Sequence, residues 1–138
     1  MRDYQRYPGS VSRTASGTFD VNLVPGAAEL DGAVKRFELT KRFHGDFDGT
    51  GTGVMLSGGD PQAGTAGYVA IETVNGRLGD RDGCFALQQF GTMRAGHQTL
   101  QYEVVPGSGD GELTGISGSL HLTIDKDGTH HYELEYDL

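Results

Sequence analysis

Apolar and polar residues alternate along most of the chain. In residues 37–47, FELTKRFHGDF, one set of alternate positions is apolar or glycine except at Lys41, and the other set is polar throughout. An alternation with a period of two is the pattern of a β-strand that turns one face to a protein core. This stretch therefore predicts a strand whose buried face carries a lysine.

The same alternation predicts seven further strands. They cover residues 18–23, 51–56, 67–74, 84–93, 100–105, 119–124 and 130–138. Turn-forming pairs separate several of them, such as Asn75 with Gly76 and Asp127 with Gly128. The glycine-rich stretch at residues 46–53, DFDGTGTG, is interpreted as a hairpin turn. Only residues 27–35 suggest a helix, of one or two turns, so the strands are expected to be antiparallel.

Eight or so alternating strands in 138 residues favour a single all-β domain. The two architectures that fit are a closed antiparallel barrel and a two-sheet sandwich. A barrel leaves no exposed sheet edge, and a barrel of eight strands can hold one small ligand. Residues 1–13 are expected to form a mobile arm, and residues 14–138 the barrel.

Charge and hydropathy limit the partners and the location. The formal net charge is −8 and the pI is near 4.9, which argues against binding to nucleic acid or to an anionic membrane. The chain has no apolar run of 18 residues and no charged-then-apolar leader, so a soluble, cytoplasmic protein is expected.

No pattern of residues points to a metal or a cofactor. Cys84 is the only cysteine, so no internal disulfide can form. The histidines lie in different segments without the spacing of metal ligands. The glycines at residues 46–53 lead into a strand and not into a phosphate-binding helix. The expectation is a protein that works without metal or cofactor.

Four segments together resemble a known family. They are KRFHGDFDGTGTGVML, AGYVAIETVNGRLGDRDGCFALQQFGTM, VVPGSGDGELTGISGSL and HHYELEYDL. Their order and spacing are similar to those of a bacterial family of unknown function whose folds resemble the allene oxide cyclase barrel. The resemblance covers roughly residues 14–138 and implies an eight-stranded antiparallel barrel with an interior cavity. Members of that family usually carry histidine where this chain has Gln89, and an acidic residue where it has Val54.

The lysine on the buried face needs a partner, because burying an unpaired ammonium costs several kcal/mol. The pattern of residues 67–74 alone would bury Val69 and Ile71 and leave Glu72 in water. The resemblance implies the opposite face, with Tyr68 and Glu72 toward the cavity. Lys41 and Glu72 could then form an inward ion pair.

These expectations define a candidate site. Glu72, Lys41 and Tyr68 are the candidate catalytic residues, which would polarise a carbonyl group or transfer a proton. The candidate substrate-binding residues are Gln89, Tyr102, His130, Tyr132, Tyr136, Phe85, Leu87 and Phe43. The function expected is that of a cofactor-independent cyclase or isomerase of a small, largely apolar carbonyl compound.

Other interpretations remain open. The barrel could carry such a compound without changing it, or a filled barrel could act through its surface. The ion pair could be a structural salt bridge at one barrel end, with the tyrosines as core residues. If Val69, Ile71 and Phe90 lie outside, the apolar strip they form would favour a homodimer or homotrimer.

Overall fold

The computed structural model describes residues 12–26, 32 and 34–138. Most of the expected N-terminal arm, residues 1–11, lies outside the described residues, and so does most of the segment 27–35 that suggested a helical turn. Within the part of the chain that is described, no helix is long and apolar enough to cross a membrane.

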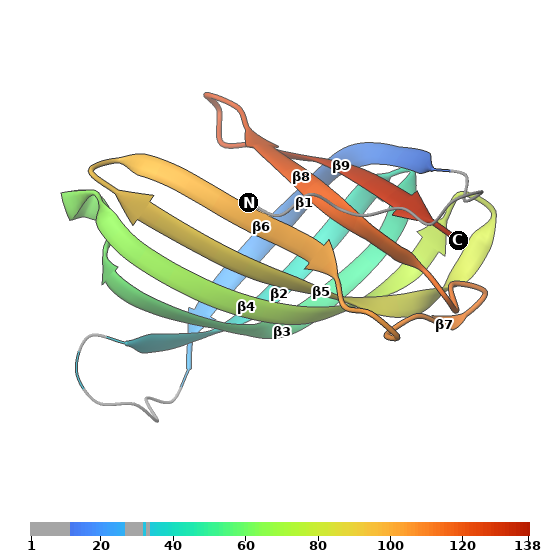
Figure 1. Cartoon of the computed structure of the whole chain (residues 1–138), viewed down its shortest axis with the longest axis horizontal. Helices are drawn as coiled ribbons and strands as arrows, with labels where there is room; N and C mark the ends of the chain where they lie inside the picture. Colours follow the sequence, from blue (N-terminus) through green and yellow to red (C-terminus); the bar gives the residue numbers. More distant parts are fainter. Residues whose placement is uncertain (1–11, 27–31, 33) are drawn as a thin grey trace.

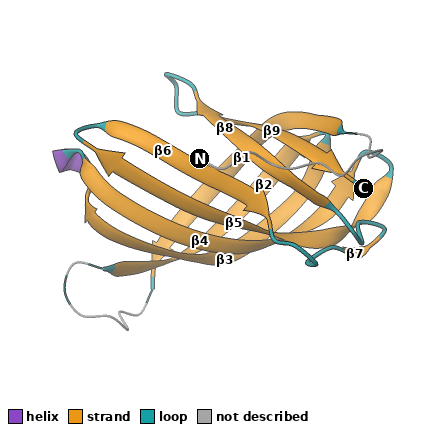
Figure 2. Ribbon diagram, in the orientation of Figure 1, coloured by secondary structure: helices purple, strands orange, loops and turns teal. Residues whose placement is uncertain are grey.

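Strands make up nearly all of the regular structure (Figure 2). They are β1 (Arg13–Pro25), β2 (Lys35–Gly45), β3 (Phe47–Asp60), β4 (Thr65–Leu78), β5 (Arg81–Arg94), β6 (His97–Val104), β7 (Asp110–Gly111), β8 (Ser117–Ile124) and β9 (His130–Asp137). A 3-10 turn, η1 (Pro61–Ala63), connects β3 to β4.

The strands close into a barrel (Figure 1). Their order is β4-β3-β2-β1-β9-β8-β6-β5, and β5 pairs back onto β4, so the eight long strands form a ring. All these pairs are antiparallel, and the short β7 adds to one end of β5. The prediction of an eight-stranded antiparallel barrel is confirmed, and the sandwich is excluded.

Two glycine-based turn predictions were wrong. Asn75 and Gly76 lie inside β4, and the chain reverses further on, where Gly79 has a positive φ of 62°. A Cβ on Gly76 would lie 2.3 Å from the backbone oxygen of Asp48, so this glycine allows close strand packing. Of the stretch 46–53, only Asp46 lies at the reversal between β2 and β3, because β3 begins at Phe47.

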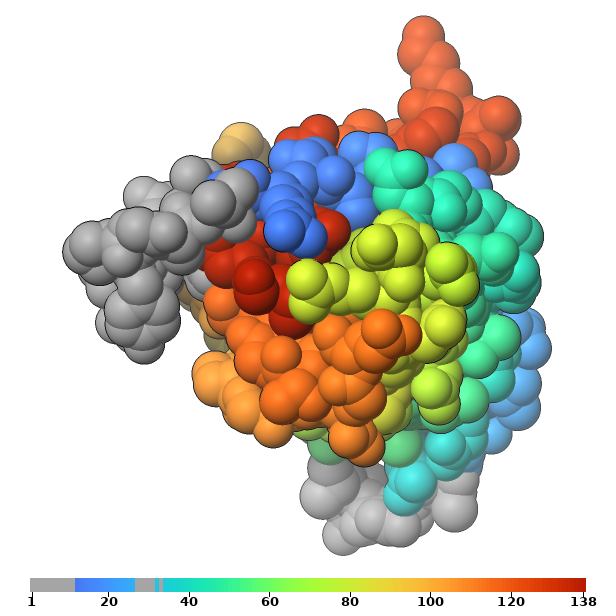
Figure 3. All heavy atoms as spheres, turned by 90° about the vertical axis from the view of Figure 1, so that its right-hand side faces the viewer, coloured from blue at the N-terminus to red at the C-terminus, as the bar shows by residue number. Residues whose placement is uncertain are grey.

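One end of the barrel is filled by aromatic and aliphatic side chains. Phe47 packs edge-on against Phe43 and Phe85, with ring centroids 5.2 and 5.7 Å apart. Leu113 and Ile116, from the segment between β7 and β8, are almost fully buried in the same core. Figure 3 shows this end covered by atoms of the segment around β7 (orange) and of the β4–β5 hairpin (yellow-green).

Candidate functional site

The other half of the barrel contains a cavity of about 650 Å³. This volume is within the range of small-molecule sites, about 300–1,000 Å³. Aliphatic side chains such as Leu39, Met55, Leu100 and Leu122 form much of its wall. Four of the predicted site residues also line it, namely Lys41, Tyr68, Gln89 and His130.

Glycines on β3 make room for the two charged residues of the site. Lys41 on β2 pairs with Gly51, and Glu72 on β4 pairs with Gly53. At these two inward positions β3 therefore carries no side chain between β2 and β4, so the lysine and the carboxylate can meet across that strand. The GTGTG stretch was the sequence signal that β3 leaves room for Lys41 and Glu72 to meet. Its interpretation as a turn led the sequence analysis to miss that signal.

Lys41, Glu72 and Tyr102 form a closed hydrogen-bonded cluster. Lys41 Nζ donates to Glu72 Oε1 at 3.0 Å and to the Tyr102 hydroxyl oxygen at 2.7 Å, and the Tyr102 hydroxyl donates to the same Oε1. The Lys41 and Glu72 side chains are 4% and 0% exposed. The ammonium also lies 4.6 Å from the ring centroid of Phe19, close enough for a cation–π contact. These contacts compensate the cost of burying the Lys41 charge.

Within this cluster, Lys41 is the member that reaches the cavity. Glu72 and Tyr102 are not among the residues that line the cavity, and both are buried behind it. Glu72 Oε2 is buried and has no hydrogen-bond partner among the described residues. The cluster thus forms a polar floor, and Lys41 is the residue through which it borders the largely apolar cavity.

Burial changes the proton affinities of the cluster. Removal from water lowers the pKa of Lys41, and the Glu72 carboxylate opposes that change. Burial, followed by the nearby Glu72 charge, raises the pKa of Tyr102 well above its usual value. The pKa of Tyr68 is raised to about 12 for the same two reasons. Near neutral pH both phenols therefore keep their protons and act as hydrogen-bond donors.

A second polar pair lies on the cavity wall. The Tyr68 hydroxyl donates to Gln89 Oε1 at 2.8 Å, which leaves the Gln89 amide nitrogen as a further donor. The Tyr68 ring covers Gly91, where a Cβ would lie 2.4 Å from a ring carbon. His130 is half-buried on the wall, and its ring centroid is 5.1 Å from that of Phe19.

Five other predicted substrate-binding residues do not line the cavity; they are Tyr132, Tyr136, Phe85, Leu87 and Phe43. Tyr132 instead holds the β2–β3 connection, because its hydroxyl accepts from the backbone N–H of Phe47 at 2.9 Å and donates to the carbonyl of His44 at 3.0 Å. Alternation assigns a residue to the inside of a barrel but does not give its depth along the axis.

The inward face of β4 is the one that the resemblance implied. Glu72 is 2% exposed, whereas Val69 and Ile71 are 45% and 54% exposed. The expectation from the pattern alone, with Val69 and Ile71 buried, was wrong. No group of three or more metal-ligating side chains is found in the described residues.

Comparisons with known proteins agree with this fold. No curated protein matches the chain. A crystal structure of a protein of unknown function from Shewanella oneidensis MR-1, assigned to the DUF3224 family, is similar at 42% sequence identity and a TM-score of 0.86, covering 91% of this chain and 96% of that one. The likeness to the allene oxide cyclase barrel stays a prediction. The model of the DUF3224 family, described as proteins of unknown function, matches residues 15–136, and the chain therefore belongs to that family.

Proposed function

We propose that the barrel binds a small, largely apolar carbonyl compound in its cavity and isomerises or cyclises it without a cofactor. The observation that carries this proposal is the position of Lys41, which lines the cavity and whose buried ammonium is hydrogen-bonded to Glu72 and Tyr102. An ammonium fixed in a water-poor site can stabilise negative charge that develops on a substrate oxygen.

The charge balance of the site favours a ligand without formal charge. Among the described residues that line the cavity, Lys41 is the only Lys, Arg, Asp or Glu, and the charge of Glu72 beside it balances its own. A carboxylate ligand would bring a second negative charge close to Glu72. A ketone, an aldehyde or an unsaturated carbonyl compound would supply an acceptor oxygen without that repulsion.

The hydrogen bonds of the floor leave one donor for such an oxygen. An ammonium has three N–H groups, and two of those on Lys41 are used by Glu72 and Tyr102. A carbonyl oxygen above the floor can accept from the third. Lys41 gives this proton to the oxygen as charge develops there, and the amine that results takes the proton of an adjacent C–H bond. The C–H electron pair forms the new double bond of an enol, and the ammonium is restored. The lowered pKa of Lys41 favours the first of these transfers.

The test is hydrogen exchange in a panel of medium-chain ketones and enones dissolved in D₂O. The wild-type protein is expected to accelerate exchange at the carbon next to the carbonyl group, followed by ¹H NMR. The double variant Lys41→Met with Glu72→Gln is expected to lose that acceleration while keeping its circular dichroism spectrum. If no member of the panel exchanges faster with the wild type than with the double variant, the catalytic proposal fails.

The alternative is a carrier that binds the same class of compound and leaves it unchanged. The predominance of aliphatic side chains on the cavity wall supports this second candidate. A carrier would show saturable binding without exchange, and its affinity would change little in the double variant. The open cavity weighs against a filled barrel that acts only through its surface.

A further inference from the structure

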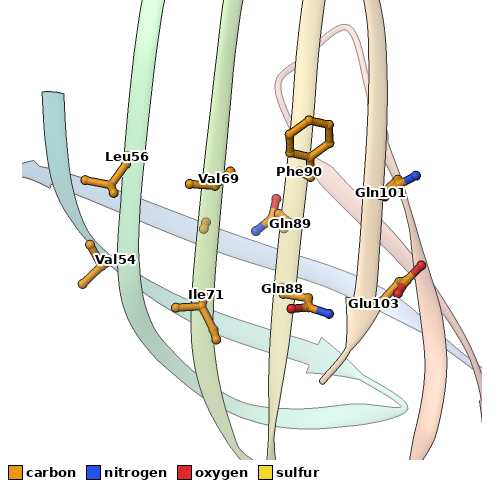
Figure 4. Close-up of a pocket in the computed structure, with 10 residues that line it drawn as sticks. Val54, Leu56, Val69, Ile71, Gln88, Gln89, Phe90, Gln101 and Glu103 are labelled. Carbon is orange, nitrogen blue, oxygen red and sulfur yellow. The ribbon is translucent and has the colours of Figure 1, made fainter. Parts of the chain in front are cut away.

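The outer wall of the barrel over β3, β4, β5 and β6 carries two rows of side chains that run across the strands. The pairing of the strands sets one row as Leu56, Val69, Phe90 and Gln101, and the other as Val54, Ile71, Gln88 and Glu103. Figure 4 shows both rows, labelled, on the four strands. We call these eight residues the outer face.

The outer face is apolar and exposed. Ile71 and Phe90 are 54% and 55% exposed, and a hollow of about 370 Å³ lies among the side chains of the two rows. Exposed apolar residues scattered singly are ordinary, but a contiguous apolar patch on a sheet usually marks a contact surface. The hollow leaves space that apolar side chains of a second surface can fill.

This part of the wall is almost free of charge. Glu103 is the only charged residue of the outer face, and the flanking rows on these strands are uncharged as well; they are Gly58, Gly67, Thr92 and Thr99 on one side, and Thr52, Thr73 and Ala86 on the other. The wall formed by β1, β2 and β9 is different, since its exposed or half-buried residues include Asp20, Glu38, Arg42, Glu133 and Glu135. Depletion of charge is typical of the centre of a protein interface.

We propose that two copies of this chain associate through the outer face, related by a two-fold axis. The reason for a second copy as the occupant is charge: each chain has a net charge of −8, so copies repel one another except where a face is neutral. The outer face is also self-complementary, because its charged residue can be matched by a residue of the same face. A partner selected by charge would find nothing to bind here.

One arrangement brings apolar residues together and pairs the charged residue of the face with an amide. If the two-fold axis crosses the strands between the two rows, each row lies on the other row of the second copy. Val69 then packs on Ile71, Phe90 on Gln88, and the Gln101 amide can donate to Glu103. No like charges meet, and each contact occurs twice.

The size of the face sets the strength of the dimer. The outer face with its flanking rows is four strands wide, at about 4.8 Å a strand, and about seven residues long, at about 3.4 Å a residue. Each copy therefore contributes a surface of roughly 19 by 24 Å, and the two copies together bury on the order of 1,000 Å². Specific interfaces begin near that area, and small ones are weak. The dimer should therefore dissociate on dilution.

Sedimentation velocity across a wide range of protein concentration tests the dimer. The wild type is expected to shift from monomer to dimer as concentration rises. Ile71→Glu buries a charge in the interface and should stay monomeric, whereas the control Val24→Glu, at a residue 51% exposed on another strand, should behave as the wild type. A wild type that stays monomeric throughout, an Ile71→Glu variant that still dimerises, or a trimer mass would overturn the proposal.

A charge pair at Gln101 tests the two-fold arrangement. Gln101→Lys should dimerise more tightly than the wild type, because the lysine faces Glu103 of the second copy, and Gln101→Glu should dimerise less tightly. Asn22→Lys, exposed on β1, controls for the change in net charge and should have a smaller effect than Gln101→Lys. If both Gln101 variants shift the dissociation constant in the same direction, the rows do not face each other as proposed.

Discussion

Lys41 and Glu72 meet inside the barrel across a strand that has only glycine between them. Their Nζ and Oε1 atoms are 3.0 Å apart, and their strand partners are Gly51 and Gly53. The two side chains come from strands that are not neighbours in the sheet, so the contact requires that β3 carry no inward side chain at this level. The ion pair beside the cavity therefore depends on the glycines of β3.

Removing one member of the pair should cost more than removing both. Lys41→Met leaves a fully buried carboxylate without its cation, which costs about 3–5 kcal/mol of the free energy of unfolding. Adding Glu72→Gln removes that charge, so the double variant should stay within about 3 kcal/mol of the wild type. Urea unfolding of the wild type, the two single variants and the double variant measures this coupling.

Two outcomes would count against this account of the pair. If the double variant loses as much stability as the sum of the single variants, Lys41 and Glu72 are not coupled. If Lys41→Met costs no more stability than the double variant, the buried Glu72 carboxylate does not depend on its cation.

The glycines of β3 should differ in their tolerance of alanine. A Cβ on Gly53 would lie 2.2 Å from the backbone oxygen of Ile71, so Gly53→Ala should cost more than about 2 kcal/mol. At Gly58, on the same strand, the nearest atom would be a methyl carbon of Val34 at 3.8 Å, so Gly58→Ala should be neutral or slightly stabilising. Thermal unfolding of both variants checks this, and equal losses would show that the space over β3 is not needed.

The sequence was sufficient to predict the strands and their closure, because the alternation of apolar and polar residues is a direct consequence of a two-sided barrel wall. It failed where one residue type serves two purposes. Gly76 and the glycines at residues 49–53 looked like turn residues, yet they lie in strands that pack closely against neighbours. Local composition cannot distinguish a reversal of the chain from a close approach between strands.

The candidate site was predictable only in part, for a physical reason. Val69 and Ile71 are more apolar than Glu72, so a pattern that buries apolar residues selects the wrong face of β4. Glu72 faces inward because it pairs with Lys41, which is 31 residues away in sequence. Tyr132 lies inside, as its alternation suggests, but it bonds to the backbone at the β2–β3 connection. Depth along the barrel depends on the stagger of the strands, which a single strand does not reveal.

The tyrosines of the site should resist ionisation. Tyr68 has a pKa of about 12 and that of Tyr102 is raised well above 10.0, so both should stay protonated in the native protein at about pH 11. Because these folded-state values are raised, the stability they contribute is fully present below pH 10 and is lost as the pH rises above it. Near-ultraviolet titration of tyrosinate, native against urea-unfolded, measures this. Equal titration of all tyrosines in the two states would contradict it.

Lys41 should contribute to the pH dependence with the opposite sign. Its folded-state pKa is lowered, so the unfolded chain binds its proton more tightly, and stability should rise with pH between the lowered value and 10.5. Tyr102→Phe would reduce the loss of stability at alkaline pH, and Lys41→Met would remove the rise in stability below pH 10.5. Unfolding free energies measured at a series of alkaline pH values can separate the two effects. If both variants show the same dependence of unfolding free energy on pH as the wild type, Tyr102 and Lys41 are not the groups responsible.

Filling the cavity should abolish ligand binding without unfolding the barrel. Met93 lines the cavity and is half-buried, so Met93→Trp places a large ring in the open space. The variant is expected to lose binding of carbonyl ligands by at least about tenfold, equivalent to 1.4 kcal/mol, and to keep its melting temperature. Val24→Trp is the matched control outside the cavity. Binding that survives in Met93→Trp would place the ligand elsewhere.

Lys41 should act as an ammonium and not as a covalent nucleophile. Glu72 at 3.0 Å favours its protonated form, and an imine requires the free amine. Incubation with a ketone or aldehyde and borohydride should therefore give no reduced adduct on Lys41 by peptide mass spectrometry, with the exposed Lys35 and Lys126 as internal comparisons. A dominant adduct on Lys41 would replace the proposed polarisation with Schiff-base chemistry.

The central claim is that Lys41 polarises a carbonyl oxygen held in the cavity. The most direct measurement is the infrared stretching frequency of a ¹³C-labelled ketone from the exchange panel, bound to the wild type and to the Lys41→Met, Glu72→Gln variant. The account predicts that the bound carbonyl stretch falls below its frequency in water for the wild type and rises above it in the variant, where the surroundings of the oxygen are apolar. The same frequency in both proteins would contradict the claim and leave the barrel as a carrier.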